Sequence, residues 1–133
     1  NNLLPEFNAL ENVLLPQLIA GVKHDMALKR SKNLIEKVGL GARMYHRPLE
    51  MSGGEQQRIA VCRSISNDPR ILLADEPTGN LDTENSEIVM NLIYSIVKET
   101  GMSALIATHN LEMVKSMDRV VRLEENKIHE VEN

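Results

Sequence analysis

Two short apolar segments place the tightest limits on how this chain can fold. Ile71 to Ala74 and Ser103 to Ala107 are separated by a stretch, from about Thr83 to Thr100, in which apolar residues recur at helical spacing. A strand, a helix and a second strand in this order predict a parallel pair, because antiparallel strands need only a short turn between them. Both segments are nearly continuous in apolar residues, which is typical of a parallel sheet covered on both faces. This half of the chain is therefore expected to be α/β.

The first half of the chain predicts helices. One helix follows Asn8, and Pro16 is expected to kink it or to end it early. A second helix runs from about Asp25 to Val38, with Gly39 as its C-terminal stop. Residues 40–51 have no apolar period and are expected to form a loop.

The change of pattern divides the chain into two parts. Residues 1–66 are expected to form a helical subdomain that ends with the helix beginning after Ser52, and residues 67–133 to form the sheet-containing part. The second part also predicts a helix after Asn110 and a hairpin from Arg119 to Val131.

Composition excludes several classes of function. The net charge of the 133 residues is −4, and they include three aromatic residues and no Trp, so we expect no nucleic-acid partner, because base stacking needs aromatic side chains on a basic surface. The single cysteine, Cys62, has no partner for an internal disulfide, which favours a reducing compartment. Apolar runs are far shorter than the ~18 residues of a membrane span, so we expect any membrane association to go through a partner protein.

The segment Ser52-Gly53-Gly54-Glu55 opens a helix. Ser52 as N-cap and Glu55 three residues later form a capping box, which places the start of the helix. The two glycines leave backbone N–H groups uncovered at the positive end of the helix dipole, where a phosphate group can bind. A well-capped helix with no ligand explains the same four residues.

Two acidic residues, Asp75 and Glu76, follow the first apolar strand. The carboxyl edge of an open α/β sheet is where ligands bind, and alternation along the strand sends the two side chains to different sides. Asp75 is suited to hold Mg²⁺ through oxygen, and Glu76 to take a proton from water. Two solvated acids at the end of a strand are the alternative.

Two further polar residues belong to the same region of the expected fold. Asp82 follows Gly79-Asn80-Leu81 and is placed to cap the long helix, which by itself would explain its presence. His109 comes directly after the second strand, so it emerges at the same sheet edge as Asp75 and Glu76. The other histidines share no metal-ligand spacing with His109 or with Cys62, so no zinc site is expected.

Taken together, these segments resemble the ATP-binding cassette (ABC) ATPases. The likeness is carried by four motifs in the family's order and at about its spacing: the signature motif in MSGGEQQR (51–58), the Walker B strand and following glutamate in ILLADEP (71–77), the D-loop in Asn80-Leu81-Asp82, and the switch histidine in Thr108-His109. The opening residues 2–13 look like the stretch just after the family's Q-loop, so the resemblance extends over essentially the whole chain.

The resemblance implies a partial P-loop NTPase fold with ATP and Mg²⁺ as ligands, in a subunit that pairs head to tail with a second ATPase subunit. Seven of the residues it singles out are expected to act on the nucleotide or its metal: Ser52, Gly53, Gly54 and Gln56 on the γ-phosphate bound to the partner, Asp75 on Mg²⁺, Glu76 as general base and His109 on the γ-phosphate. Asp82 is expected to link the two sites across the dimer.

The resemblance also implies a place in the cell. It predicts a peripheral protein on the cytoplasmic face of the bacterial inner membrane, coupled to integral membrane permease subunits. Within the family, residues 2–13 are most similar to the ATPases of bacterial lipoprotein-releasing systems, and macrolide-export and cell-division ATPases share residues 75–82. The C-terminal lobe of a chromosome-maintenance ATPase is a rival, although residues 1–50 lack the heptads of a coiled coil.

A phosphate-cradling Walker A loop, glycine-rich and ending in Lys-Ser or Lys-Thr, is absent from the 133 residues. We therefore expect a C-terminal fragment that lacks Walker A and the Q-loop and is inactive by itself. In the family fold the strand at 103–107 lies between the Walker B and Walker A strands, so the resemblance implies that such a fragment leaves one edge of this strand unpaired. The edge is apolar and carries no protecting charge or proline, so we expect non-native self-association through this edge or through the apolar surface beside it.

Overall fold

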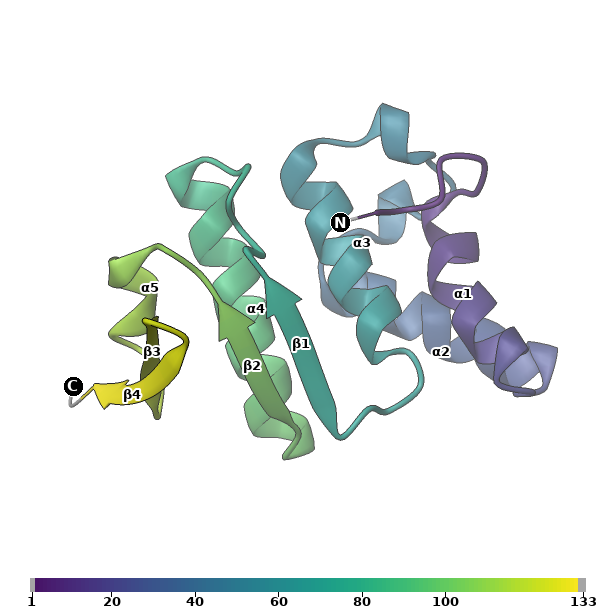
Figure 1. Cartoon of the computed structure of the whole chain (residues 1–133). Coiled ribbons are helices and arrows are strands. Elements are labelled where there is room, and N and C mark those ends of the chain that lie inside the picture. The colour runs from purple at the N-terminus through teal and green to yellow at the C-terminus, as the bar shows by residue number, and fades with distance from the viewer. Residues whose placement is uncertain (1, 132–133) are drawn as a thin grey trace.

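The computed structural model describes residues 2–131. Its elements, in chain order, are α1 (Ala9–Ile19), α2 (His24–Lys37), the 3-10 turns η1 (Gly41–Arg43) and η2 (Pro48–Glu50), α3 (Gly53–Ile65), β1 (Ile71–Asp75), α4 (Thr83–Thr100), β2 (Ser103–Ala107), α5 (Leu111–Val114), β3 (Val120–Glu124) and β4 (Lys127–Val131). Helices α1, α2 and α3 gather at one end of the molecule, and the hairpin of β3 and β4 lies at the other (Figure 1).

The first helix is not ended early by its proline, which was one of the two effects expected of Pro16. Asn8 caps α1 in a capping box with Glu11, but the helix continues for three residues beyond Pro16 and ends at Ile19. The second helix agrees with the expected one to within one residue at each end, and Gly39 has the left-handed φ of +76° that follows a helix end.

The segment 40–51 was expected to be an irregular loop, and it is more ordered than that. It contains two 3-10 turns, and its backbone carbonyls at Met44 and His46 accept hydrogen bonds from Leu10 N and Ala9 N, each at 2.9 Å. These amides belong to the first turn of α1, which has no partners within its own helix. The loop thus fixes the start of α1, a tertiary contact that local periodicity does not reveal.

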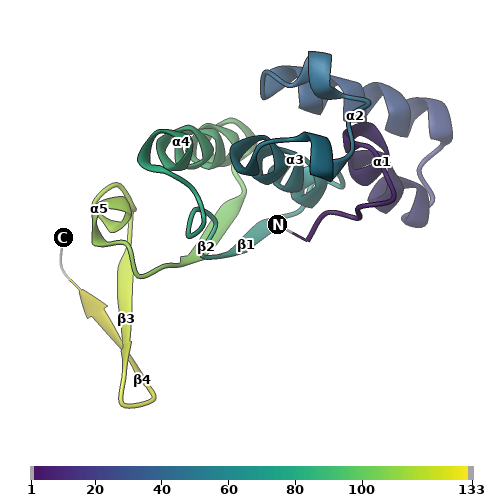
Figure 2. The ribbon, with the colours of Figure 1, turned by 90° about the horizontal axis from the view of Figure 1, so that it is seen from above.

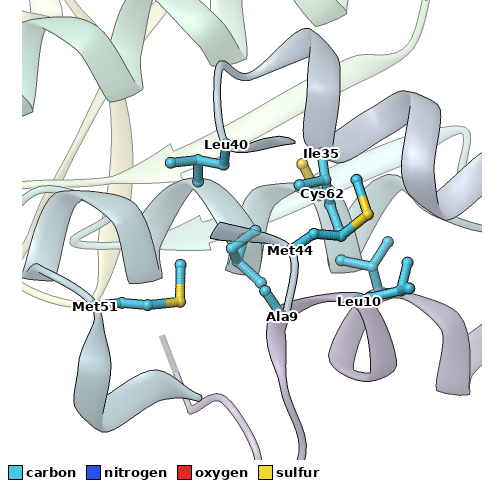
Figure 3. Packing of buried hydrophobic residues seen from close by; sticks show 9 residues of the cluster. Ala9, Leu10, Ile35, Leu40, Met44, Met51 and Cys62 are labelled. Atoms are coloured by element: carbon cyan, nitrogen blue, oxygen red, sulfur yellow. The ribbon is translucent and has the colours of Figure 1, made fainter. Parts of the chain in front are cut away.

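A first hydrophobic core joins α1, α2, α3 and the segment 40–51. It is formed by nine buried side chains: Ala9, Leu10, Val13, Ile35, Leu40, Met44, Met51, Ile59 and Cys62. Figure 3 shows the side chains of this cluster packed between the helices. Burial raises the pKa of the Cys62 thiol to about 12, so this residue behaves as a small apolar group, as the sequence predicted.

A second core lies on the opposite side of α3. Val61 and Ile65 of α3 pack with Leu72 of β1, with Val89 and Ile93 of α4, and with Met102. Helix α3 is therefore buried between the two cores and connects the helical part of the chain to the sheet.

The two strands β1 and β2 pair in parallel, with Ile71 opposite Ser103 and Asp75 opposite Ala107. Helices α3 and α4 lie on the same side of this pair (Figure 2). The expectation that both faces are covered is wrong for residues 2–131, because Leu73 and Leu105 on the open face are 72% and 61% exposed. Apolar composition alone does not say whether the chain itself supplies both covering layers.

The end of the chain forms the expected hairpin. Strands β3 and β4 are antiparallel, with Val120 opposite Val131, and their turn places Glu125 and Asn126 at φ values of +48° and +60°. The hairpin projects away from the β1–β2 pair (Figure 2). Among the described residues, every helix is too short or too polar to cross a membrane.

Candidate functional site

The end of β1 carries the two acidic residues, and its geometry is set by β2. Glu76 N donates to Ala107 O at 2.9 Å, which continues the β1–β2 pairing by one residue. Glu76 has a φ of +44°, in the left-handed region that non-glycine residues seldom adopt. The backbone therefore turns sharply after Asp75, and Gly79 N closes the turn on Glu76 O at 3.1 Å.

The Glu76 carboxylate accepts hydrogen bonds from two residues that follow β2. Oε1 lies 2.9 Å from His109 N and 2.6 Å from His109 Nδ1, and Oε2 accepts from Thr108 Oγ1 at 3.2 Å. The His109 side chain, together with the backbone N–H and Thr108, lowers the pKa of Glu76 below its ordinary value. Glu76 and His109 thus meet at one sheet edge, as the sequence predicted, and the carboxylate is ionised at neutral pH.

Asp75 and Glu76 face different clefts. Asp75 lines a shallow cleft of about 240 Å³ between β1 and α3, together with Gln57 and Ala60. Glu76 lines a cleft of about 600 Å³ on the other side, bordered by residues of α4 and by His109. The expectation that the two side chains point to different sides is confirmed, but its stated reason is not, because Glu76 lies beyond the end of β1 and its φ of +44° places it in a turn rather than in strand alternation.

The carboxylate oxygens of Asp75 are of the kind that Mg²⁺ prefers. Within residues 2–131, however, groups of three or more His, Cys, Asp or Glu side chains that could enclose a metal ion are lacking. The chemistry of the Asp75 carboxylate is compatible with Mg²⁺, an ion that in proteins usually keeps several waters and binds one or two carboxylates together with substrate phosphates.

The N-terminus of α3 is capped as expected. Ser52 Oγ accepts from Glu55 N at 3.2 Å, and Ser52 N donates to Glu55 Oε2 at 2.8 Å. The hydrogen bond from Ser52 N lowers the pKa of Glu55, with Arg43, which lies 3.2 Å from its Oε1, contributing. The ionised Glu55 opposes the attraction of this helix end for an anion, and Arg43 partly offsets its charge.

Gln56 is placed differently from the other residues expected at this helix end. Its Nε2 donates to Pro48 O at 2.8 Å and to Met51 O at 3.1 Å. These bonds fold the amide back onto the segment that precedes α3. Gln56 therefore holds the segment that leads into Ser52, a role that its position in the motif did not suggest.

Asp82 caps α4, as predicted. Its Oδ1 accepts from Asn85 N at 2.8 Å, and both carboxylate oxygens accept from Asn85 Nδ2, at 3.0 and 2.9 Å. The backbone N–H of Asn85, followed by its side chain, lowers the pKa of Asp82. Asp82 is an ionised carboxylate held on an exposed helix end.

Sequence reasoning missed two residues of this region. Thr108 binds Glu76, and its place next to His109 was the available signal. Asn85 binds Asp82, and the signal was its place three residues after the N-cap, where capping partners occur.

Comparison with known proteins identifies this combination of motifs. The family model described as ABC transporter matches residues 1–79 of the chain. The chain belongs to the ABC transporter family. The matched range includes the capped start of α3 and the end of β1 with Asp75 and Glu76.

Several similar curated proteins are ATP-binding proteins of lipoprotein-releasing systems. The chain is 58% identical over 128 residues to the lipoprotein-releasing system ATP-binding protein LolD of Cereibacter sphaeroides, and 55% identical over 130 residues to LolD of a Ruegeria species. These alignments cover 96% and 98% of the chain and 57% of each relative. The chain thus spans little more than half the length of these proteins.

Solved structures give the same fold. A dimeric post-hydrolysis state of the ATP-binding cassette MJ0796 bound to ADP and Pi matches with a TM-score of 0.82 and 30% identity, over 99% of this chain and 60% of that one. A putative metal-chelate type ABC transporter matches with a TM-score of 0.86 at 22% identity, which shows the fold alone. The expected partial P-loop NTPase fold of the ABC ATPase type is confirmed.

Proposed function

We propose that this chain forms part of the ATP-hydrolysing subunit of an ABC transporter that powers the release of lipoproteins from a membrane. The observation that carries the hydrolytic role is the Glu76 carboxylate, ionised and oriented by His109 and Thr108 at the end of β1. The observation that favours lipoprotein release is identity of 50–58% to LolD proteins of several bacteria.

In this proposal Glu76 is the general base. Its carboxylate accepts a proton from the water that attacks the γ-phosphate, and its ionised state at neutral pH meets that requirement. His109 holds Oε1 through both its backbone N–H and its ring, and we propose that the ring also contacts the γ-phosphate. Thr108 fixes the second oxygen, which leaves the carboxylate little freedom to rotate.

The start of α3 is proposed to contact a phosphate bound to a second ATPase subunit. Ser52, Gly53 and Gly54 offer a hydroxyl and backbone N–H groups at the positive end of the helix. Gln56 acts indirectly in this scheme, through its bonds to the preceding segment. Support for a dimer comes from the MJ0796 cassette, a 30–31% identical structure described as dimeric.

Asp75 is proposed as a ligand of Mg²⁺, which neutralises phosphate charge when it is bound. Asp82, held at the start of α4, is proposed to connect the two sites of the dimer. The substrate itself would be handled by integral membrane permease subunits, with this chain lying peripherally on the cytoplasmic face of the bacterial inner membrane. We further propose two parts, a helical subdomain of residues 1–66 and a part of the nucleotide-binding core in residues 67–133, and we propose that closing such a dimer moves the helical subdomain relative to the membrane subunits.

The hydrolytic roles are tested in a subunit that joins these residues to the Walker A part found in the family. We expect Glu76→Gln to lower hydrolysis by on the order of 10²-fold or more while ATP binding persists, because only the proton acceptor is lost. We expect Asp75→Asn to weaken the Mg²⁺-dependent part of binding. Identical effects of the two variants on binding and turnover would show that the separate roles are wrong.

The 133-residue chain is expected to bind Mg-ATP weakly and to hydrolyse it undetectably, since it holds no Walker A loop. Isothermal titration calorimetry measures the affinity. Micromolar binding, or turnover that Glu76→Gln abolishes, would contradict this part of the proposal.

The lipoprotein assignment is separable from the ATPase assignment. A subunit containing these residues should restore growth to cells depleted of their own lipoprotein-release ATPase, and its Glu76→Gln form should not. Restoration of macrolide export or of cell division in place of lipoprotein release would assign the chain to another branch of the family.

A further inference from the structure

The start of α3 lies directly against the start of α4. An ideal Cβ built on Gly54 would lie 2.7 Å from Asn85 Cγ and 3.1 Å from Asn85 Cβ, and closer still to Asn85 Oδ1. Real Cβ atoms essentially never come as close to another atom as this Cβ would to Asn85 Cγ, so a side chain at position 54 would require Asn85 to shift. Gly54 is itself buried, and the contact is part of the packing between the two helices.

The Asn85 side chain has little freedom to move aside. Its Nδ2 donates to both oxygens of Asp82, and its backbone N–H donates to the same carboxylate. Rotating the amide away from Gly54 would break the two side-chain bonds. One side chain therefore touches the glycine segment with its oxygen and holds the Asp82 carboxylate with its nitrogen.

We propose that Asn85 is a positioning residue that fixes the Asp82 carboxylate and the N-terminus of α3 relative to each other. Through this contact, a displacement of the Asp82 loop is transmitted to the glycine segment that starts α3. The inference deepens the proposed function and rests on it for the roles of Asp82 and Gly54. The contact itself can be measured without nucleotide.

The test compares how two glycine-to-alanine substitutions change the urea midpoint of unfolding. Within a helix, alanine is more stabilising than glycine where there is room for the extra methyl group. At Gly53 the nearest atom to the added Cβ is Leu81 Cδ2 at 3.4 Å, an ordinary contact, so Gly53→Ala is the matched control. We expect Gly53→Ala to keep or raise the urea midpoint of unfolding, and Gly54→Ala to lower it.

A double variant then identifies the cause. Asn85→Gly removes the side chain that blocks the new methyl, so in this background Gly54→Ala should become neutral or stabilising. If Gly54→Ala lowers the midpoint equally with and without the Asn85 side chain, or if Gly54→Ala prevents folding in both backgrounds, the contact does not constrain Gly54 and the proposal fails.

A second readout concerns Asp82 directly. We expect Asn85→Ala to raise the pKa of Asp82, followed by carboxyl NMR, and to shift the backbone amide signals of Gly53 and Gly54. Glu84→Ala, an exposed neighbour in the same turn, should change neither. Unchanged amide signals at the two glycines in Asn85→Ala would overturn the proposal. These measurements use nucleotide-free protein, so a failure of the ATPase assignment leaves their outcome readable.

Discussion

At the scale of single residues, three carboxylates are held ionised by nearby donors. Glu55 and Asp82 belong to the caps of α3 and α4, and Glu76 directly follows β1. The two caps were predictable from sequence because a capping residue and its partner lie within one turn. The bond from Gln56 to Pro48 and the contact of Asn85 with Gly54 were not, because they depend on how separate segments pack.

The two caps make stability depend on pH. Their folded pKa values are lowered, so the unfolded chain binds more protons in acid, and the stability that the ionised caps provide is lost as pH falls below about 4.5. Glu55→Gln and Asp82→Asn keep the capping hydrogen bonds but do not titrate. We expect the urea midpoint of the wild type to fall more steeply between about pH 5 and 3 than that of the double variant. Parallel curves would show that these groups do not set the acid sensitivity.

At the scale of elements, local signals placed α4 and β2 at the residues where the structure has them. Asp82 caps the start of α4, and Gly101, with a φ of +70°, ends the helix. Both boundaries therefore lie at residue types that are typical of helix ends. The covering of the sheet was not predicted correctly. Leu72 is 5% exposed and its neighbour Leu73 is 72% exposed, because both α3 and α4 pack on one face. Apolar residues predict that a strand can be buried, but they do not show which segment packs on each of its faces.

Helix α3 contributes side chains to both cores, and the stability that its packing in the first core provides can be measured. Ile59 is fully buried in the first core, so Ile59→Ala should lower the free energy of unfolding by roughly 2–5 kcal/mol through lost burial and the cavity left behind. Leu49→Ala, at a residue that is 91% exposed, is the control and should cost under about 0.5 kcal/mol. Urea unfolding measures both. A small cost at Ile59 would mean that α3 is loosely packed against α1 and α2.

At the scale of the whole molecule, each strand of the β1–β2 pair has an unpaired outer edge among residues 2–131, and the edge of β2 is the one that borders an apolar groove. Among residues 2–131, β2 pairs with β1 alone. Ser103 N donates to Arg70 O, and Ala107 O accepts from Glu76 N, so alternation directs the amides of Ala104 and Ile106 to the open side. An apolar groove of about 430 Å³ lies beside this edge, lined by residues of β2, α5 and the hairpin. Unpaired amides next to apolar surface favour the addition of another strand.

In a purified sample, the strand that can pair with this edge comes from a second copy of the chain. We therefore expect the 133-residue chain to self-associate through β2. Ala104→Pro removes one open-side N–H without touching a bond to β1, because proline is tolerated on the free side of an edge strand. Ala104→Ser keeps that N–H at similar size and serves as the control. Light scattering at rising concentration should show association of the wild type and of Ala104→Ser, with Ala104→Pro shifted towards monomer. A monodisperse wild-type monomer with well-dispersed amide signals for residues 103–107 would contradict edge pairing. Equal association of all three proteins would show that the contact does not use the β2 edge and would leave the outer edge of β1 or the exposed face around Leu73 and Leu105 as the contact.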